Sequence, residues 1–112
     1  MKFINKIFSK LKYRTNSNEI TLQEAISIKN DNNKAILLDV RSPQEYAEYC
    51  LKGAILIPLY ELKYRVTRMI PNKETIIIVY CKIGKRSKKA VDILKRLGYS
   101  NIYHIKGGLE GE

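Results

Sequence analysis

Apolar residues alternate along the chain between short continuous runs and sets with helical spacing. Largely apolar runs of strand length occupy residues 35–40, 53–58, 74–80 and 101–105. Continuous runs of this kind are typical of strands buried on both faces of a parallel sheet. Helical spacing appears in the segments between them. The pattern therefore predicts an α/β fold in which helices cover both faces of a parallel sheet.

Two of the intervening segments carry recognisable helix starts. Thr21 with Glu24 three residues later forms a capping box, and we expect that helix to end in the turn-rich residues 30–33. Ser42 is the expected N-cap of a second helix, with Pro43 at its first position.

Two further helices are expected over residues 59–70 and 87–98. Gly98 supplies the stop of the second one. The residues predicted to face inward are Leu59, Leu62, Val66, Met69, Ile70, Ala90, Val91, Leu94 and Leu97.

The first residues have a different character. Their apolar residues fall on one helical face with lysines elsewhere, which predicts a short basic amphipathic helix. We therefore divide the chain into this helix with its linker, residues 1–17, and one α/β domain, residues 18–112. The segment either folds back onto the domain, is a frayed terminus, or makes a weak peripheral contact with a partner or the inner face of a membrane. Its apolar face consists of Phe3, Ile4, Ile7, Phe8 and Leu11.

The chain is strongly basic, with 21 Lys and Arg against 11 Asp and Glu. Such a balance suits nucleic acid, an anionic membrane or small anionic substrates. Nucleic-acid binding is not expected, because stacking on bases needs aromatic residues interleaved with the basic ones, and the basic runs hold one phenylalanine between them.

The positions of the cysteines and the hydropathy of the chain indicate the cellular compartment of the protein. No apolar stretch approaches the roughly 20 residues that span a bilayer. Cys50 and Cys81 are far apart and no secretory signal pattern is present, which favours the reducing cytoplasm over a disulfide framework. One histidine and two cysteines at this spacing do not predict a metal site, and nothing in the sequence implies a cofactor.

Cys81 ends the third apolar run and is followed at once by cations. Gly84 gives the backbone freedom for a tight loop before a helix that we expect to begin at Ser87. Amides of such a loop can form a nest for an anion, and the helix N-terminus adds unpaired N–H groups and partial positive charge. The cations are Lys82, Lys85 and Arg86.

We expect the Cys81 thiol to ionise more readily in this field than a free cysteine does. The thiolate would then be both the nucleophile and the anion that the loop holds. The alternative is an inert cysteine that closes a buried strand as a small apolar residue. The glycine, the cations, the serine and the strand–loop–helix context together favour a functional cysteine.

Three motifs carry a resemblance to a known family. They are Asp-Val-Arg at residues 39–41, Cys-x-x-Gly-x-Arg-Ser at residues 81–87 and Gly-Gly at residues 107–108. In their order and intervals, over about residues 19–109, they resemble the rhodanese (sulfurtransferase) domain family. The resemblance implies a three-layer α/β fold with a five-stranded parallel sheet flanked by helices.

The resemblance also implies roles for these residues. Cys81 would take a sulfane sulfur from a donor such as thiosulfate and pass it, through a persulfide, to cyanide or a protein thiol. Asp39 and Arg41 would support the loop from nearby, the alternative being a surface ion pair at a strand end. The substrate-binding residues, whose amides would hold the terminal sulfur and whose cations would attract the donor, are Lys82, Ile83, Gly84, Lys85, Arg86 and Ser87.

Loop length separates this reading from protein tyrosine phosphatases and dual-specificity phosphatases, which also hold a cysteine in an anion loop. Residues 82–85 separate Cys81 from Arg86, one residue fewer than in those phosphatases. The shorter loop should suit sulfur rather than a tetrahedral phosphate.

Some positions depart from the family pattern. Cys50 stands at the usual histidine and Lys52 at the usual proline. Cys50 is either a resolving thiol that could form a disulfide with Cys81 or an inert substitution. The tryptophan usual after the Gly-Gly is absent, and His104 in the last predicted strand is interpreted as structural.

Two functions are compatible with the sequence. The first is an active sulfurtransferase whose partners are a small anionic sulfur donor and a thiol acceptor. The second is a non-catalytic binding or regulatory module that keeps the fold and is held at a membrane by its N-terminal helix. The sequence does not determine the oligomeric state.

Overall fold

The structure, a computed structural model, describes residues 18–111, and its centre is one five-stranded sheet. The strands lie in the order β1-β5-β4-β2-β3, and every neighbouring pair is parallel. The helix predicted within residues 1–17 lies outside the described residues. The strands are β1 (Glu19–Ile20), β2 (Ile36–Asp39), β3 (Ile55–Leu56), β4 (Ile77–Tyr80) and β5 (Ile102–Ile105).

The predicted parallel α/β sheet is confirmed, and β2 to β5 fall within the four apolar runs. The first strand was implied by the family resemblance alone. It is two residues long and pairs at the sheet edge, with Glu19 beside His104 and Ile20 beside Ile105. A strand of this length leaves no periodic signal in the sequence.

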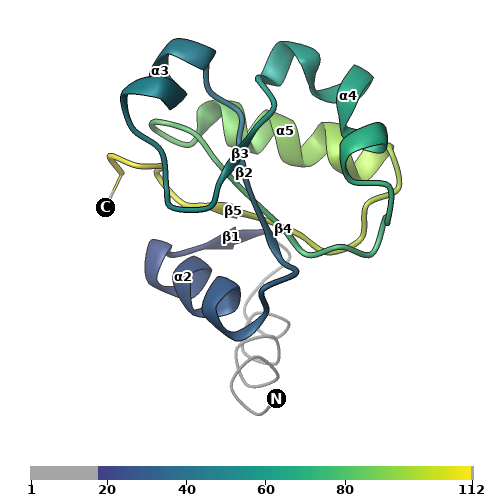
Figure 1. The fold of residues 1–112 in the computed structure, drawn as a ribbon, viewed down its shortest axis with the longest axis horizontal. Coiled ribbons are helices and arrows are strands. Elements are labelled where there is room, and N and C mark those ends of the chain that lie inside the picture. Colours follow the sequence, from purple (N-terminus) through teal and green to yellow (C-terminus); the bar gives the residue numbers. More distant parts are fainter. Residues whose placement is uncertain (1–17, 112) are drawn as a thin grey trace.

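Helices cover both faces of the sheet, which gives the three predicted layers (Figure 1). Helix α2 (Leu22–Asp31) packs on one face, while α4 (Leu62–Met69) and α5 (Lys85–Arg96) pack on the other. Helix α3 (Pro43–Glu48) follows β2, and a 3₁₀ turn (Leu59–Glu61) leads into α4.

Strand β4 distributes its side chains to both apolar clusters. Ile77 and Val79 lie in the cluster under α4 and α5, whereas Ile78 and Tyr80 lie in the cluster under α2. The alternation continues past the end of the strand, so Cys81 belongs to the α5 side. The period of the strand therefore directs the sulfur toward the start of the next helix.

Both predicted capping boxes are present. In the first, Thr21 Oγ1 accepts the amide of Glu24 at 3.0 Å and the Glu24 carboxylate accepts the amide of Thr21 at 2.9 Å. In the second, Ser42 Oγ accepts the amide of Glu45 at 3.1 Å and the Glu45 carboxylate accepts the amide of Ser42 at 2.9 Å. Each box satisfies amides that an uncapped helix would leave unpaired.

Two predictions about helices were wrong in detail. Helix α5 begins at Lys85 rather than Ser87, because Gly84, with φ +98°, already serves as its N-cap. Met69, predicted to face inward, is exposed, because Leu62 and Val66 one turn apart form the buried face of α4. Within residues 18–111, no helix is long and apolar enough to cross a bilayer.

The two faces of α4 should differ in their contribution to stability. Leu62→Ala removes a side chain with no exposed surface and should lower the free energy of unfolding by about 2–5 kcal/mol. Met69→Ala, on the exposed side of the same helix, should cost less than about 1 kcal/mol. Urea unfolding measures both, and equal losses would contradict the orientation of α4.

Candidate active site

Cys81 comes directly after β4, the central strand, and its sulfur accepts two backbone amides. The amide of Gly84 lies 3.1 Å from Sγ and the amide of Ser87 lies 3.3 Å from it. The thiol is fully buried, but these amides point toward the sulfur. The main chain from Gly84 to Ser87 thus curves around the sulfur of Cys81.

The amide of Ser87 belongs to the first turn of α5, at the third helical position. At an ordinary N-cap, a Ser, Thr, Asp or Asn oxygen accepts this amide. Gly84 has no side chain to do so, and no side-chain cap is present at this helix. The sulfur of Cys81 therefore takes the position of the capping acceptor, where the helix dipole favours negative charge.

Ser87 connects the sulfur to a residue on β5. Its hydroxyl lies 3.6 Å from Cys81 Sγ, 3.1 Å from the carbonyl oxygen of Gly84 and 3.2 Å from Nδ1 of His104. From the sequence, His104 is interpreted as structural, with no link to residues 81–87, the loop around the sulfur that we call the cradle. A lone polar residue inside an apolar strand was the available signal, but only the parallel pairing of β4 with β5 brings it beside Ser87.

The late Gly-Gly motif packs against the main chain of the cradle. The amide of Leu109 donates to the carbonyl oxygen of Cys81, and the amide of Glu110 donates to that of Lys82, both at 2.9 Å. A Cβ on Gly108 would overlap the carbonyl group of Cys81 and that of Lys82. Gly108 also has φ +65°, so glycine is required there by both conformation and space.

Asp39 and Arg41 form a buried pair beside β4, which excludes the alternative of a surface ion pair. Arg41 Nε lies 3.0 Å from Asp39 Oδ1, and Arg41 Nη2 lies 2.7 Å from Oδ2. Arg41 also donates to the carbonyl oxygen of Tyr49 and lies over the ring of Tyr80. Its hydrogen bonds thus fix the segment after α3 against the end of β2, and none of these bonds goes to residues 82–87.

The three cations after Cys81 have different surroundings. Arg86 makes two hydrogen bonds to the carboxylate of Glu45 in α3, at 2.7 and 3.0 Å. Lys82 lies 3.5 Å from Glu110, with both side chains largely in solvent. Lys85 is exposed and has no carboxylate partner within residues 18–111. The hydrogen bonds from Arg86 lower the pKa of Glu45 to about 2.

A sequence model of the rhodanese-like domain matches residues 21–111. The chain belongs to the rhodanese-like domain family. It is 40% identical over 73 residues to thiosulfate sulfurtransferase PspE of Escherichia coli (strain K12). The aligned region covers 65% of this chain and 69% of that protein.

Solved structures agree with this assignment of a rhodanese-like domain. The human single-domain sulfurtransferase TSTD1 matches with a TM-score of 0.73 and 27% identity, over 82% of this chain and 91% of that one. A rhodanese from E. coli, solved with anions, matches with a TM-score of 0.62 and 39% identity. This match covers 67% of this chain and 87% of that one. The similarities support a sulfurtransferase of the rhodanese type.

Cys50 of this rhodanese-like domain is half-buried, and both Cys50 and Cys81 are free thiols. The Cys50 side chain lies near Tyr46, where it contributes, after burial, to the raised pKa of the Tyr46 hydroxyl. A resolving thiol and an inert substitution both stay predictions for Cys50.

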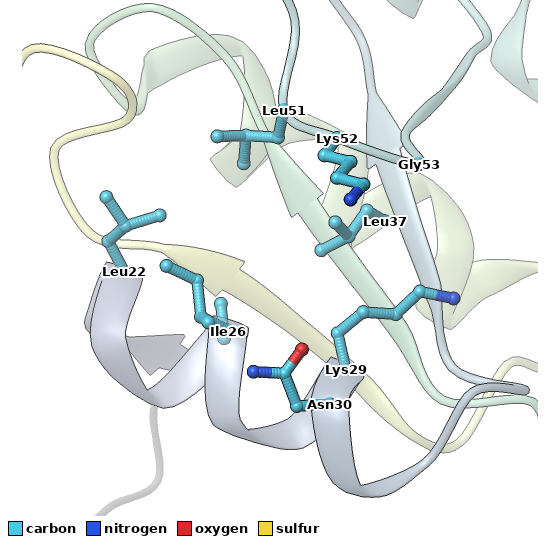
Figure 2. Close-up of a pocket in the computed structure, with 9 residues that line it drawn as sticks. Leu22, Ile26, Lys29, Asn30, Leu37, Leu51, Lys52 and Gly53 are labelled. Atoms are coloured by element: carbon cyan, nitrogen blue, oxygen red, sulfur yellow. The ribbon is translucent and has the colours of Figure 1, made fainter.

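A cavity of about 550 Å³ lies away from the cradle, between α2 and residues 51–53 (Figure 2). It is mainly apolar, and no residue of 81–87 lines it. Because it contains neither Cys81 nor its amide donors, the rhodanese-like chemistry is not assigned to it. Its lining residues are Leu22, Ala25, Ile26, Lys29, Asn30, Leu37, Leu51, Lys52 and Gly53.

The contact between the Gly-Gly turn and the cradle can be tested with two glycines of positive φ. Gly98→Ala places a side chain in open space at φ +96° and should cost about 1–2 kcal/mol for the left-handed backbone alone. Gly108→Ala adds a steric overlap with the main chain of Cys81 and Lys82, so it should cost more and should also slow alkylation of Cys81. Chemical unfolding and iodoacetamide labelling measure the two effects, and equal behaviour of the variants would contradict the packing.

The pair between Glu45 and Arg86 predicts a pH dependence of stability. Because the folded-state pKa of Glu45 is lowered to about 2, the pair stabilises the fold fully above the unfolded-state pKa of about 4.3, and this contribution is lost as the pH falls toward 2. Glu45→Gln keeps an oxygen for the cap but removes the charge. The difference in unfolding free energy between the wild type and Glu45→Gln should therefore shrink between pH 5 and pH 2.

Glu48→Gln, an exposed position on the same helix, is the control for this titration. Its difference from the wild type should vary much less over the same pH range. A Glu45→Gln difference that stays constant with pH would show that the ion pair does not stabilise the folded state.

Proposed function

We propose that this chain moves a sulfane sulfur from a donor such as thiosulfate to a thiophilic acceptor, through a persulfide on Cys81. The observation that carries the proposal is the convergence of the Gly84 and Ser87 amides on the Cys81 sulfur, at 3.1 and 3.3 Å. Hydrogen bonds to the charged form of a group favour that form. The name of the PspE relative, thiosulfate sulfurtransferase, supports thiosulfate as the donor.

In the first half of the reaction, the Cys81 thiolate attacks the outer sulfur of thiosulfate. The sulfur–sulfur bond of the donor breaks, and sulfite leaves with the electron pair. The product on the protein is a persulfide, whose terminal sulfur carries the negative charge. Amides from Lys82 to Ser87 that are not bonded to Sγ are then available to hold this terminal sulfur.

In the second half, an acceptor nucleophile attacks the terminal sulfur. Cyanide gives thiocyanate, and a thiolate of a protein or small molecule gives a new persulfide. The bond between the two sulfurs of the protein persulfide breaks, and Cys81 leaves as a thiolate. The same amides that stabilise the starting thiolate make Cys81 a good leaving group.

The cations assist the donor to different extents in this proposal. Lys85 is exposed at the start of α5 and has no carboxylate partner within residues 18–111, so it can meet an anionic donor directly. Arg86 is held by Glu45 and contributes its charge from a fixed position. Long-range attraction by such a basic surface raises the encounter rate with anions and weakens as the salt concentration rises.

Access to the sulfur requires local movement, because Cys81 has no exposed surface. The loop residues that precede α5 are exposed, with Ile83 51% accessible. A shift of this loop would open the sulfur while leaving the central strand in place.

Two free cysteines also support a reducing compartment such as the cytosol as the site of this chemistry.

Mass spectrometry of the intact protein tests the proposal. Incubation with thiosulfate should add the mass of one sulfur atom, and cyanide should then remove it as thiocyanate. Cys81→Ser should gain nothing, because the nucleophile is lost, whereas Cys50→Ser should gain sulfur as the wild type does. A wild-type protein that gains no sulfur from thiosulfate, or a Cys81→Ser protein that turns over thiosulfate and cyanide unchanged, would refute the mechanism and leave a non-catalytic module.

A further inference from the structure

Four polar groups form a row from the cradle to a cleft lined by residues of β1, β5 and α5. Ser87 Oγ lies 3.6 Å from Cys81 Sγ and 3.2 Å from His104 Nδ1. On the other side of the imidazole, Nε2 lies 3.8 Å from the carboxylate of Glu19. The first three residues are buried, while the Glu19 side chain is 39% exposed. The row therefore begins at a buried thiol and ends at a group that reaches solvent.

We propose that His104 is a positioning residue that relays the proton of the Cys81 thiol, through Ser87, to the side of the molecule where Glu19 meets solvent. The inference concerns how Cys81 becomes a thiolate, and its place in catalysis rests on the proposed function. A fully buried thiol must pass its proton to another group before its sulfur can attack, and Ser87 is the side chain within reach.

The Ser87 hydroxyl is able to change its partner. Its acceptor in one orientation is the carbonyl oxygen of Gly84, which also accepts the amide of Lys88 at 3.1 Å. When the hydroxyl turns away, that carbonyl keeps a hydrogen bond. Rotation toward His104 or toward Cys81 thus leaves no buried acceptor unpaired.

Two arrangements of the protons fit these distances. In the thiol form, the S–H of Cys81 donates to Ser87 Oγ, the hydroxyl donates to Nδ1 of His104, and Nε2 carries the imidazole proton toward Glu19. In the thiolate form, Nδ1 of His104 carries the proton and donates to Ser87 Oγ, and the hydroxyl donates to the sulfur.

The change from the thiol form to the thiolate form conserves every proton and needs no other reactant than water. The S–H bond breaks as a new O–H bond forms, the original O–H proton moves to Nδ1, and the Nε2 proton leaves to Glu19 or to water. The imidazole is neutral before and after, and it changes only its tautomer. The net result is a thiolate on Cys81 and a proton released on the Glu19 side.

The surroundings of His104 suit a neutral relay. Burial is the main cause that lowers its pKa, Glu19 acts in the opposite direction, and Lys88 adds to the lowering. A cleft of about 170 Å³ opens next to the ring, and its charged lining residues are Glu19, Lys88, Asp92 and Lys95. On the strand side, His104 pairs with Val79 of β4, and Cys81, which directly follows β4, lies in the same apolar cluster as Val79.

The tautomer of His104 can be observed directly, because this is the one histidine in the chain. In protein labelled with ¹⁵N-histidine, the two ring nitrogens have distinct shifts depending on which one carries the proton. The proton should move from Nε2 to Nδ1 as Cys81 ionises. The ultraviolet absorbance of the thiolate measures the ionisation of Cys81 in the same samples. In Cys81→Ala the switch should be absent. An unchanged tautomer across the ionisation of Cys81 in the wild type would overturn the relay.

Variants supply a functional readout. His104→Asn places an amide where Nδ1 lies, so it keeps a partner for Ser87 but has no second nitrogen to pass a proton on. The midpoint of Cys81 alkylation against pH should rise by about one unit in this variant. Persulfide formation at neutral pH should slow about tenfold or more.

Two carboxylates in the cleft provide a matched control. Glu19→Gln should shift the alkylation midpoint in the same direction as His104→Asn, because the carboxylate facing Nε2 is lost. Asp92→Asn removes an equal charge from the same cleft but not from the row, so it should leave the midpoint near the wild-type value. Equal shifts of the midpoint in Glu19→Gln and Asp92→Asn would show that any negative charge in the cleft has this effect, and this would contradict the relay.

These readouts separate the two proposals. Alkylation and the histidine tautomer need no sulfur donor, so a failed sulfur transfer leaves them measurable. If His104→Asn does not fold, the tautomer of the wild-type protein still decides. A normal mass gain from thiosulfate combined with an unchanged tautomer would retain the sulfurtransferase and refute the relay.

Discussion

A sulfur atom at the start of a helix is the constraint on which the site depends. Cys81 accepts the amide of Ser87, in the first turn of α5, together with the amide of Gly84 at the N-cap. These are the donors that a helix leaves unpaired at its N-terminus, and their partial positive charge is greatest there. The same contacts that complete the start of the helix therefore hold the sulfur in place.

The surrounding main chain is shaped by this arrangement. Gly84 adopts φ +98° to turn the chain into α5, and Gly108 lies against the carbonyl groups of Cys81 and Lys82. The C-terminal turn then adds hydrogen bonds to both carbonyls. Because the inner side of the loop faces the sulfur and its outer side is bonded to this turn, the cradle is held from both sides.

Charge around the cradle is more balanced than the composition of the whole chain suggests. The chain has a formal net charge of +10, but Arg86 is paired with Glu45 and Arg41 with Asp39. The first pair connects α3 to α5, and Arg41 of the second pair also lies over the ring of Tyr80 in β4, so both positive charges are fixed in place. Buried or partly buried pairs of this kind are screened by salt much less than exposed ones.

The sequence alone determined the alternation of apolar runs and helices, both capping boxes, and the cysteine–glycine–serine loop at the end of the third apolar run. These features are local, since each depends on residues a few positions apart. Only the tertiary structure decided that His104 lies beside Ser87, that Arg86 is held by Glu45, and that Asp39 and Arg41 are buried. The first two contacts join residues far apart in the chain, and the burial of Asp39 and Arg41 depends on the elements packed around them; strand order and helix packing decide both, which periodicity along one segment does not specify.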